Sequence, residues 1–173
     1  MRLGIITISD KGARGEREDL SGGVIREVMA RAGAEMQRYD IVPDEASLIA
    51  EKVAAWADAG DLDVIVTTGG TGLAARDVTP DAVRTILNRE IPGFGETMRQ
   101  ETLKYTPMAI LSRAIAGTRA GTLIITLPGS PKAVRECLEA VLPAVPHAVE
   151  IISGAVTEHV IPATGPPSGQ GQA

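Results

Sequence analysis

Short apolar runs alternate with amphipathic segments along the first half of the chain. Runs at 3–8, 36–42 and 62–67 predict strands, and the first and third are apolar enough to be buried on both faces. Amphipathic segments at 21–32 and 47–60 follow the first two runs and predict helices. This alternation predicts an α/β fold, with a mostly parallel open sheet covered by helices on both faces.

The alternation loosens in the second half, where turn and cap signals mark the elements. Thr79-Pro80-Asp81 combines a cap, a proline and an acid, which predicts a helix start. The stretch 114–127 predicts a β-hairpin turning at AGTRAG, an antiparallel edge whose second arm TLIITL returns to the sheet. Further helices are predicted over about 94–105, over 132–142 behind the cap pair Ser130-Pro131, and over 147–153.

Length and composition indicate one ordinary globular domain. The chain has 173 residues, 44% of them hydrophobic and 23% charged. We expect this domain to span 1–155. The remaining stretch, 156–173, ends in a Pro/Gly-rich sequence with few apolar residues to bury, so we expect it to be disordered or held by a partner.

Charge and residue usage exclude several function classes. A net charge of −5 without a basic stripe, together with 2% aromatic residues, argues against nucleic acid and anionic membranes as partners. No apolar run approaches the roughly 20 residues of a membrane span, and the N-terminus reads as a strand rather than a signal peptide, so we expect a cytoplasmic protein. Cys137 is the only cysteine, and His147 and His159 lie outside the strand-following loops, which argues against zinc and nucleophilic triads.

Ligands of open parallel sheets bind at the carboxyl ends of the strands, so the loops there are the candidate site. The loop TTGGTGLAARD after the third strand has three glycines within four positions, Gly69, Gly70 and Gly72, with Thr71 between them. Such a loop turns backbone N–H groups toward phosphate. A tight turn without a ligand is the plainer alternative.

Two known phosphate-binding motifs place glycines directly after a strand, as this loop does. The GxxxxGK[ST] pattern is absent. The segment 70–75 does fit GxGxxA, which keeps a dinucleotide-binding oxidoreductase as an alternative, with Glu90 as the nearest acid at the required spacing. However, Pro80 indicates that the helix begins too late for that motif, and Glu90 lies in a helix-like segment.

Two acids follow strands on this edge of the predicted sheet. If Asp44 and Asp77 converge, they suit Mg²⁺, which takes one or two carboxylates plus substrate phosphates. Helix capping by Asp44, and turn capping or pairing with Arg76 by Asp77, are the structural alternatives. The loop LPGSPK, at 127–132, adds a helix N-terminus, and Ser112-Arg113 adds a hydroxyl and a fork donor. These groups suit phosphoryl or nucleotidyl transfer.

Four motifs in order, TTGGTG…RDVTPDA, EIPGFGETMRQ, TPMAILSRAIAG and LPGSPKAVRECL, make the chain closely resemble the molybdopterin adenylyltransferase family. This family includes the MogA and MoaB proteins and the G domain of gephyrin, and the resemblance runs from about Leu3 to Gly154. It implies a three-layer α/β fold, often a homotrimer, and Mg²⁺-dependent transfer of AMP from ATP to the terminal phosphate of molybdopterin. It also implies hand-over of the product to the enzyme that inserts molybdate.

The resemblance assigns roles to residues that match the family motifs. It implies that Asp44 and Asp77 are the essential, metal-binding aspartates. It gives substrate-binding positions to the glycine loop, to the first-loop SD pair and to segments lining the pocket; these are Gly69, Gly70, Thr71, Gly72, Ser9, Asp10, Ser112, Pro128, Gly129 and Ser130. A non-catalytic, MoaB-like molybdopterin-binding scaffold remains the alternative of a different class.

Overall fold

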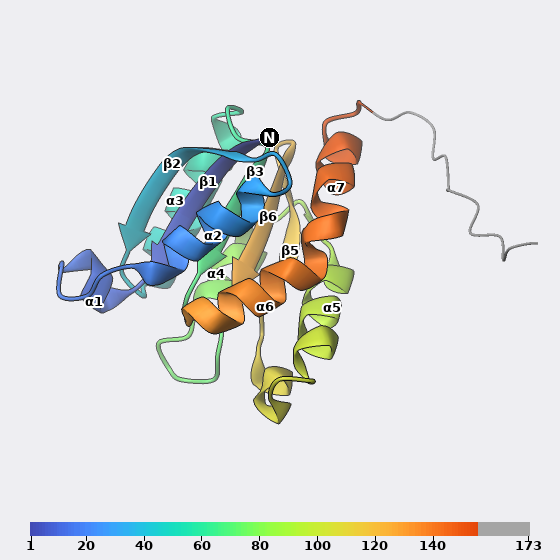
Figure 1. Ribbon diagram of the computed structural model, residues 1–173. Helices are drawn as coiled ribbons and strands as arrows, with labels where there is room; N and C mark the ends of the chain where they lie inside the picture. Colours follow the sequence, from blue (N-terminus) through green and yellow to red (C-terminus); the bar gives the residue numbers. More distant parts are fainter. Residues whose placement is uncertain (156–173) are drawn as a thin grey trace, which may run out of the picture.

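A six-stranded sheet forms the middle of the molecule in the computed structural model, which describes residues 1–155 (Figure 1). The predicted tail, 156–173, lies outside the described residues. The strands are β1 (Arg2–Ile8), β2 (Glu35–Val42), β3 (Val64–Thr68), β4 (Arg89–Glu90), β5 (Ala116–Arg119) and β6 (Thr122–Leu127). Their order is β2-β1-β3-β6-β5-β4; β5 runs antiparallel to both of its neighbours, β4 and β6, and the other neighbouring strands are parallel.

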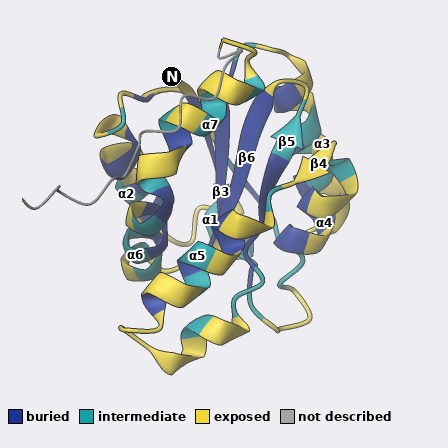
Figure 2. Ribbon diagram, turned by 90° about the vertical axis from the view of Figure 1, so that its right-hand side faces the viewer, coloured by how far each residue is buried: buried dark blue, intermediate teal, exposed yellow. Residues whose placement is uncertain are grey.

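Helices cover both faces of this sheet, so the predicted three-layer α/β fold is confirmed (Figure 2). The α-helices are α1 (Asp10–Ala13), α2 (Leu20–Ala30), α3 (Ala46–Asp58), α4 (Thr79–Ile86), α5 (Pro92–Thr102), α6 (Pro131–Val141) and α7 (Val145–Ile152). Two 3-10 helices, η1 (Pro107–Leu111) and η2 (Leu142–Ala144), complete the described elements. No helix within residues 1–155 is long and apolar enough to cross a bilayer.

The core divides into two clusters because side chains alternate across the strands. On β1, Leu3 and Ile5 face the cluster built with α2, α5, α6 and α7, while Ile6 and Ile8 face α3 and α4. The central strands β3 and β6 are buried along their whole length. This double burial explains why both strands read as continuous apolar runs.

Helix starts differ from the sequence prediction at two positions. Helix α2 begins at Leu20 rather than at Ser21, and Asp19 caps it, because its carboxylate accepts the N–H groups of Ser21 and Gly22. Helix α4 begins at Thr79 with Val78 as its N-cap, so Thr79 is a buried helical residue and not a cap.

The antiparallel edge also differs in detail from the prediction. AGTR forms β5 itself, and only Ala120 and Gly121 make the turn, with φ of 47° and 83°. Two consecutive positive φ values are typical of the type I′ turn that joins two-residue hairpins. The expectation that Glu90 lies in a helix-like segment is wrong, because Arg89 and Glu90 pair with β5 as the short edge strand β4.

The four parallel strands point their carboxyl ends to the lower end of the molecule in Figure 1. The loops after β1, β2, β3 and β6 therefore meet there, as the sequence predicted. The long green loop after β3 and the start of α6 lie on this end as well.

Candidate active site

The glycine loop after β3 makes a turn that only glycine fits. Gly69 has φ of +104° and Gly70 has φ of +62°. A Cβ on Gly69 would overlap the carbonyl oxygen of Ile8, and one on Gly70 would lie 2.5 Å from Thr79 Oγ1. The loop therefore runs against the end of β1 and the start of α4 with no room for side chains.

Arg113 fixes this loop from the other side. Its Nε donates to the carbonyl oxygen of Gly72 at 2.8 Å, its Nη2 donates to that of Asp77, and its Nη1 pairs with Asp81 at 2.7 Å. The backbone N–H of Arg113 donates to the carbonyl oxygen of Thr71 at 2.9 Å. The guanidinium of Arg113, the predicted fork donor, thus binds both ends of the segment 72–77.

The loops after β1 and β2 are joined by a reciprocal pair of hydrogen bonds. The N–H of Asp10 donates to Asp44 Oδ2 at 2.9 Å, and the N–H of Asp44 donates to Asp10 Oδ1 at 3.1 Å. Glu45, not Asp44, is the N-cap of α3, so the capping alternative for Asp44 is wrong. Arg76 reaches over from the glycine loop to both carboxylate oxygens of Asp10 at 2.7 and 2.6 Å, and this bonding lowers the pKa of Asp10.

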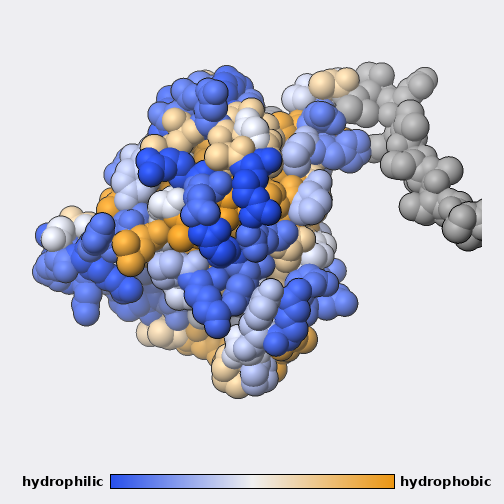
Figure 3. Space-filling model, in the orientation of Figure 1, coloured by the Kyte–Doolittle hydropathy of each residue, from blue (hydrophilic) through white to orange (hydrophobic). Residues whose placement is uncertain are grey.

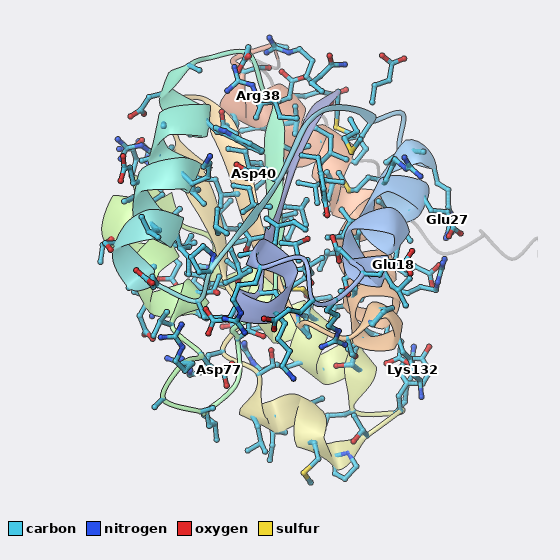
Figure 4. All side chains as sticks on the ribbon, turned by 90° about the vertical axis from the view of Figure 1, so that its left-hand side faces the viewer. Glu18, Glu27, Arg38, Asp40, Asp77 and Lys132 are labelled. Atoms are coloured by element: carbon cyan, nitrogen blue, oxygen red, sulfur yellow. The ribbon has the colours of Figure 1, made fainter. Side chains whose placement is uncertain are left out.

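Asp77 lies on the same loop as the glycines, at the lower end of the molecule in Figure 4. Its Oδ2 accepts the N–H of Ala74 at 2.8 Å, so part of the turn-capping alternative is correct. Arg76 pairs with Asp10 rather than with Asp77. The other carboxylate oxygen of Asp77 accepts no hydrogen bond from residues 1–155.

The carboxylates of Asp44 and Asp77 border successive glycine positions of the loop. A Cβ on Gly70 would lie 3.4 Å from Asp44 Oδ1, and one on Gly72 would lie 2.8 Å from Asp77 Oδ2. Within the described part of the chain, no group of three or more His, Cys, Asp or Glu side chains forms a metal site. Two carboxylates beside a glycine cradle fit Mg²⁺ that shares its coordination with phosphate oxygens.

The loop after β6 packs against the glycine loop. Thr68 Oγ1 donates to the carbonyl oxygen of Pro128 at 2.6 Å, and Ser21 Oγ donates to that of Gly129 at 2.8 Å. A Cβ on Gly129 would lie 3.4 Å from Gly69 Cα. Ser130 caps α6 as predicted, because its Oγ accepts the N–H of Ala133 at 3.2 Å.

Two cavities adjoin the contact between these two loops. The α2 cavity, of about 410 Å³, lies at the start of α2 and is lined by Ser9, Arg17, Asp19, Gly69, Gly70, Gly129 and Ser130 among others. The η1 cavity, of about 400 Å³, is lined by Gly70, Thr71, Gly72, Asp77, Ser112, Pro128 and Gly129 on one side. Met108, Ala109, Leu111, Ala133, Glu136 and Cys137 form its other wall. Gly70 and Gly129 line both cavities and form a ridge between them.

Each predicted site residue therefore lies at this end of the sheet, although not all line a cavity. Asp10 and Asp44 line neither cavity and are joined to each other by their reciprocal hydrogen bonds. Ser9 lines the α2 cavity while its Oγ accepts the N–H of Gly12 at 3.0 Å, as the N-cap of α1. Ser112 lines the η1 cavity while its Oγ accepts the N–H of Ala114 at 3.3 Å.

Sequence reasoning missed three residues that line the cavities. Asp19 lines the α2 cavity and also accepts hydrogen bonds from Thr7 Oγ1 at 2.6 Å and Tyr39 OH at 2.8 Å. Burial raises the pKa of the Cys137 thiol to about 11, and this residue also lines the η1 cavity. Glu136, beside it on α6, carried no motif signal and lines the same cavity.

The GxGxxA alternative does not match this geometry. No helix begins within 73–78, and α4 starts only at Thr79. The loop therefore lacks the helix N-terminus that holds pyrophosphate in dinucleotide-binding folds. Glu90 is exposed on the edge strand and pairs with Arg84 at 3.2 Å.

Comparison with known proteins agrees with this arrangement. Residues 4–147 match the family model described as a probable molybdopterin binding domain. The molybdopterin adenylyltransferase of Helicobacter pylori strain J99 is 47% identical over 156 residues, covering 89% of both chains. That of Escherichia coli K12 is 36% identical, covering 91% of this chain and 88% of the relative.

A solved structure gives the same result in three dimensions. The molybdopterin biosynthesis enzyme MoaB from Thermus thermophilus superposes with a TM-score of 0.83 and 55% identity, covering 88% of this chain and 96% of that one. The glycine loop, the bordering aspartates and both cavities thus lie in a chain that matches these relatives over most of its length. The protein belongs to the family of molybdopterin-binding domains that includes the molybdopterin adenylyltransferases.

Proposed function

We propose that the protein is a molybdopterin adenylyltransferase of molybdenum cofactor biosynthesis. In the proposed reaction, an oxygen of the terminal phosphate of molybdopterin attacks the α-phosphorus of ATP. A new P–O bond forms, the bond between the α- and β-phosphates breaks, and pyrophosphate leaves. The products are adenylylated molybdopterin and pyrophosphate.

The observation that carries this proposal is the ridge shared by two cavities. Each cavity is large enough for one heterocyclic substrate. We propose that one substrate occupies each cavity and that their phosphates meet over Gly70 and Gly129. Backbone N–H groups there meet no Cβ obstruction, and holding two reactants in one geometry supplies much of the rate in phosphoryl transfer.

Asp44 and Asp77 are the groups we propose for Mg²⁺, since both carboxylates border the loop that cradles the phosphates. When bound, the ion neutralises charge on the phosphates and favours departure of pyrophosphate. Arg113 acts on the chain itself, because it keeps the carbonyl groups of Gly72 and Asp77 fixed while substrates bind. Ser9 and Ser130 line the α2 cavity and Thr71 and Ser112 line the η1 cavity, where we propose that they orient the substrates.

The test is to incubate the protein with molybdopterin, ATP and Mg²⁺ and to measure AMP-linked pterin and pyrophosphate. We expect both products in equal amounts, and we expect Asp77→Asn to reduce them by about 100-fold or more, the scale seen when a single charge-stabilising group is removed. Asp58→Asn is the control, since Asp58 pairs with Arg119 far from the glycine loop. A protein that binds molybdopterin but forms no AMP-linked product would instead be the non-catalytic scaffold.

We also propose that the protein works in the cytoplasm as a homotrimer that hands its product to the molybdate-inserting enzyme. The support for the trimer is a group of exposed apolar side chains around η1, namely Leu103, Tyr105, Met108, Ile110 and Leu111. Figure 3 shows hydrophobic surface at this lower end of the molecule. Exposed patches of this kind mark protein interfaces. Light scattering that gives the mass of one chain at micromolar concentration would refute the trimer.

A further inference from the structure

Glu136 is a carboxylate that the fold places in a cavity without giving it a hydrogen-bond donor. Its side chain is 15% exposed, and it lines the η1 cavity together with Cys137 and Ala133. No hydrogen bond to Glu136 forms within residues 1–155. Its nearest cation is Lys132 Nζ, at 3.7 Å on a side chain that is 80% exposed.

The described residues around Glu136 leave its carboxylate oxygens available to a ligand. The distance to Lys132 exceeds hydrogen-bond length, and a solvated surface lysine contributes little to such a pair. The neighbouring wall is largely apolar, with Met108, Ala109 and Leu111. Glu136 is therefore placed to accept N–H groups from a ligand bound in the η1 cavity.

The chemistry of a carboxylate selects between the two heterocycles of the proposed reaction. Two carboxylate oxygens accept two parallel N–H donors, the arrangement seen in bidentate pairs. A pterin presents this edge, with the ring N3–H beside the 2-amino group. Adenine presents its amino group beside N1, which is an acceptor and repels a second carboxylate oxygen.

We propose that Glu136 is a specificity-determining residue that holds the pterin ring of the substrate by its N3–H and 2-amino edge. This inference rests on the proposed function and deepens it. A pterin held at Glu136 lies in the η1 cavity, with its phosphate directed to the side lined by Asp77 and the shared ridge. The α2 cavity is then left for ATP.

The test measures binding of two fluorescent probes to the full chain. One probe is hydroxymethylpterin monophosphate, and the other is the matching lumazine monophosphate, in which an oxo group replaces the 2-amino group. We expect Glu136→Gln to weaken binding of the pterin by about 10- to 100-fold, the range for losing hydrogen bonds to a charged group. We expect the same variant to bind the lumazine more tightly than the wild type does, because the amide N–H₂ donates to the new oxygen.

Glu139→Gln is the matched control on the same helix, since Glu139 pairs with Arg31 on the surface. It should leave the affinities for both probes unchanged. The exchange of preference between the probes is a readout that a merely structural role of Glu136 would not produce. ATP affinity should be unchanged in both variants.

Two outcomes overturn the inference, and they are distinguishable. If wild type and Glu136→Gln bind the pterin equally, Glu136 is not the recognition residue, while AMP transfer by the wild type would leave the proposed function standing. If the wild type binds neither probe and forms no AMP-linked molybdopterin, the proposed function fails and this inference fails with it.

Discussion

Replacing Gly70 with alanine tests whether the ridge between the cavities is as tightly built as the structure shows. Two costs add in this variant. Holding a residue with a Cβ in the left-handed region, here at φ of +62°, costs about 1–2 kcal/mol. Placing the Cβ 2.5 Å from Thr79 Oγ1 forces a local shift, and overpacking of that kind costs about 1–3 kcal/mol. The expected loss in free energy of unfolding is therefore about 2–5 kcal/mol.

Gly15→Ala separates the two costs. Gly15 has φ of +70°, but a Cβ there would meet nothing within 4 Å, so this variant should lose only the backbone cost of about 1–2 kcal/mol. Urea unfolding measures both losses, and Gly70→Ala should be the less stable variant by about 1–3 kcal/mol. AMP transfer should fall only in Gly70→Ala. Equal losses of stability would show that the loop yields freely at Gly70 and would refute the reasoning.

The remaining predictions concern one thiol and two arginines. Cys137 should react with a thiol reagent at pH 8 about two orders of magnitude more slowly than a free cysteine, because a pKa of about 11 leaves little thiolate; labelling at the free rate would contradict its burial. Arg76→Met should raise the pKa of Asp10 toward its ordinary value, followed by NMR titration. A carboxyl group whose pKa is lower in the folded than in the unfolded protein stabilises the fold at neutral pH, and this stabilisation is lost as the pH falls through the pKa of the folded state. Arg76→Met should therefore lower the free energy of unfolding at neutral pH, but not at a pH below the pKa of Asp10 in the folded protein. Arg113→Met should reduce the free energy of unfolding by about 2–3 kcal/mol and reduce AMP transfer, since two loop carbonyl groups lose a charged donor. Arg14→Met is the control, because it removes only an exposed ion pair. Equal stability of the two variants would refute this role of Arg113.

Strands and helices can be predicted from the sequence where their own hydrophobic pattern reflects how they are buried. The run at 3–8 and the arm TLIITL are mostly apolar and are buried because β1 and β6 lie between two helical layers. The two residues of β4, by contrast, are charged and exposed, and they form a strand only because β5 offers them an edge. The four-residue helix α1 and the 3-10 helix η1 have no periodicity long enough to detect.

The candidate site also contains some features that can be predicted from a local sequence signal and others that depend on contacts between distant segments. The glycines and the two aspartates carry a local signal, since glycine spacing and strand-following acids can be read from one segment. The Asp10–Asp44 exchange of hydrogen bonds and the aim of Arg113 depend on contacts between distant segments. Glu136 reads as an ordinary surface acid of an amphipathic helix, and only the packing of α6 beside η1 makes it part of a cavity.

The ridge at Gly70 and Gly129 has a consequence for how the proposed reaction would end. Once joined, the two halves of the product are tethered, so each half holds the other at a high effective concentration over its own cavity. The joined product dissociates more slowly than either of its halves would alone, and because the ridge is narrow, the phosphate link between the halves can be short. Turnover would then be governed by the lifetime of the bound product, and a downstream enzyme that withdraws it would act as an accelerator of the whole cycle.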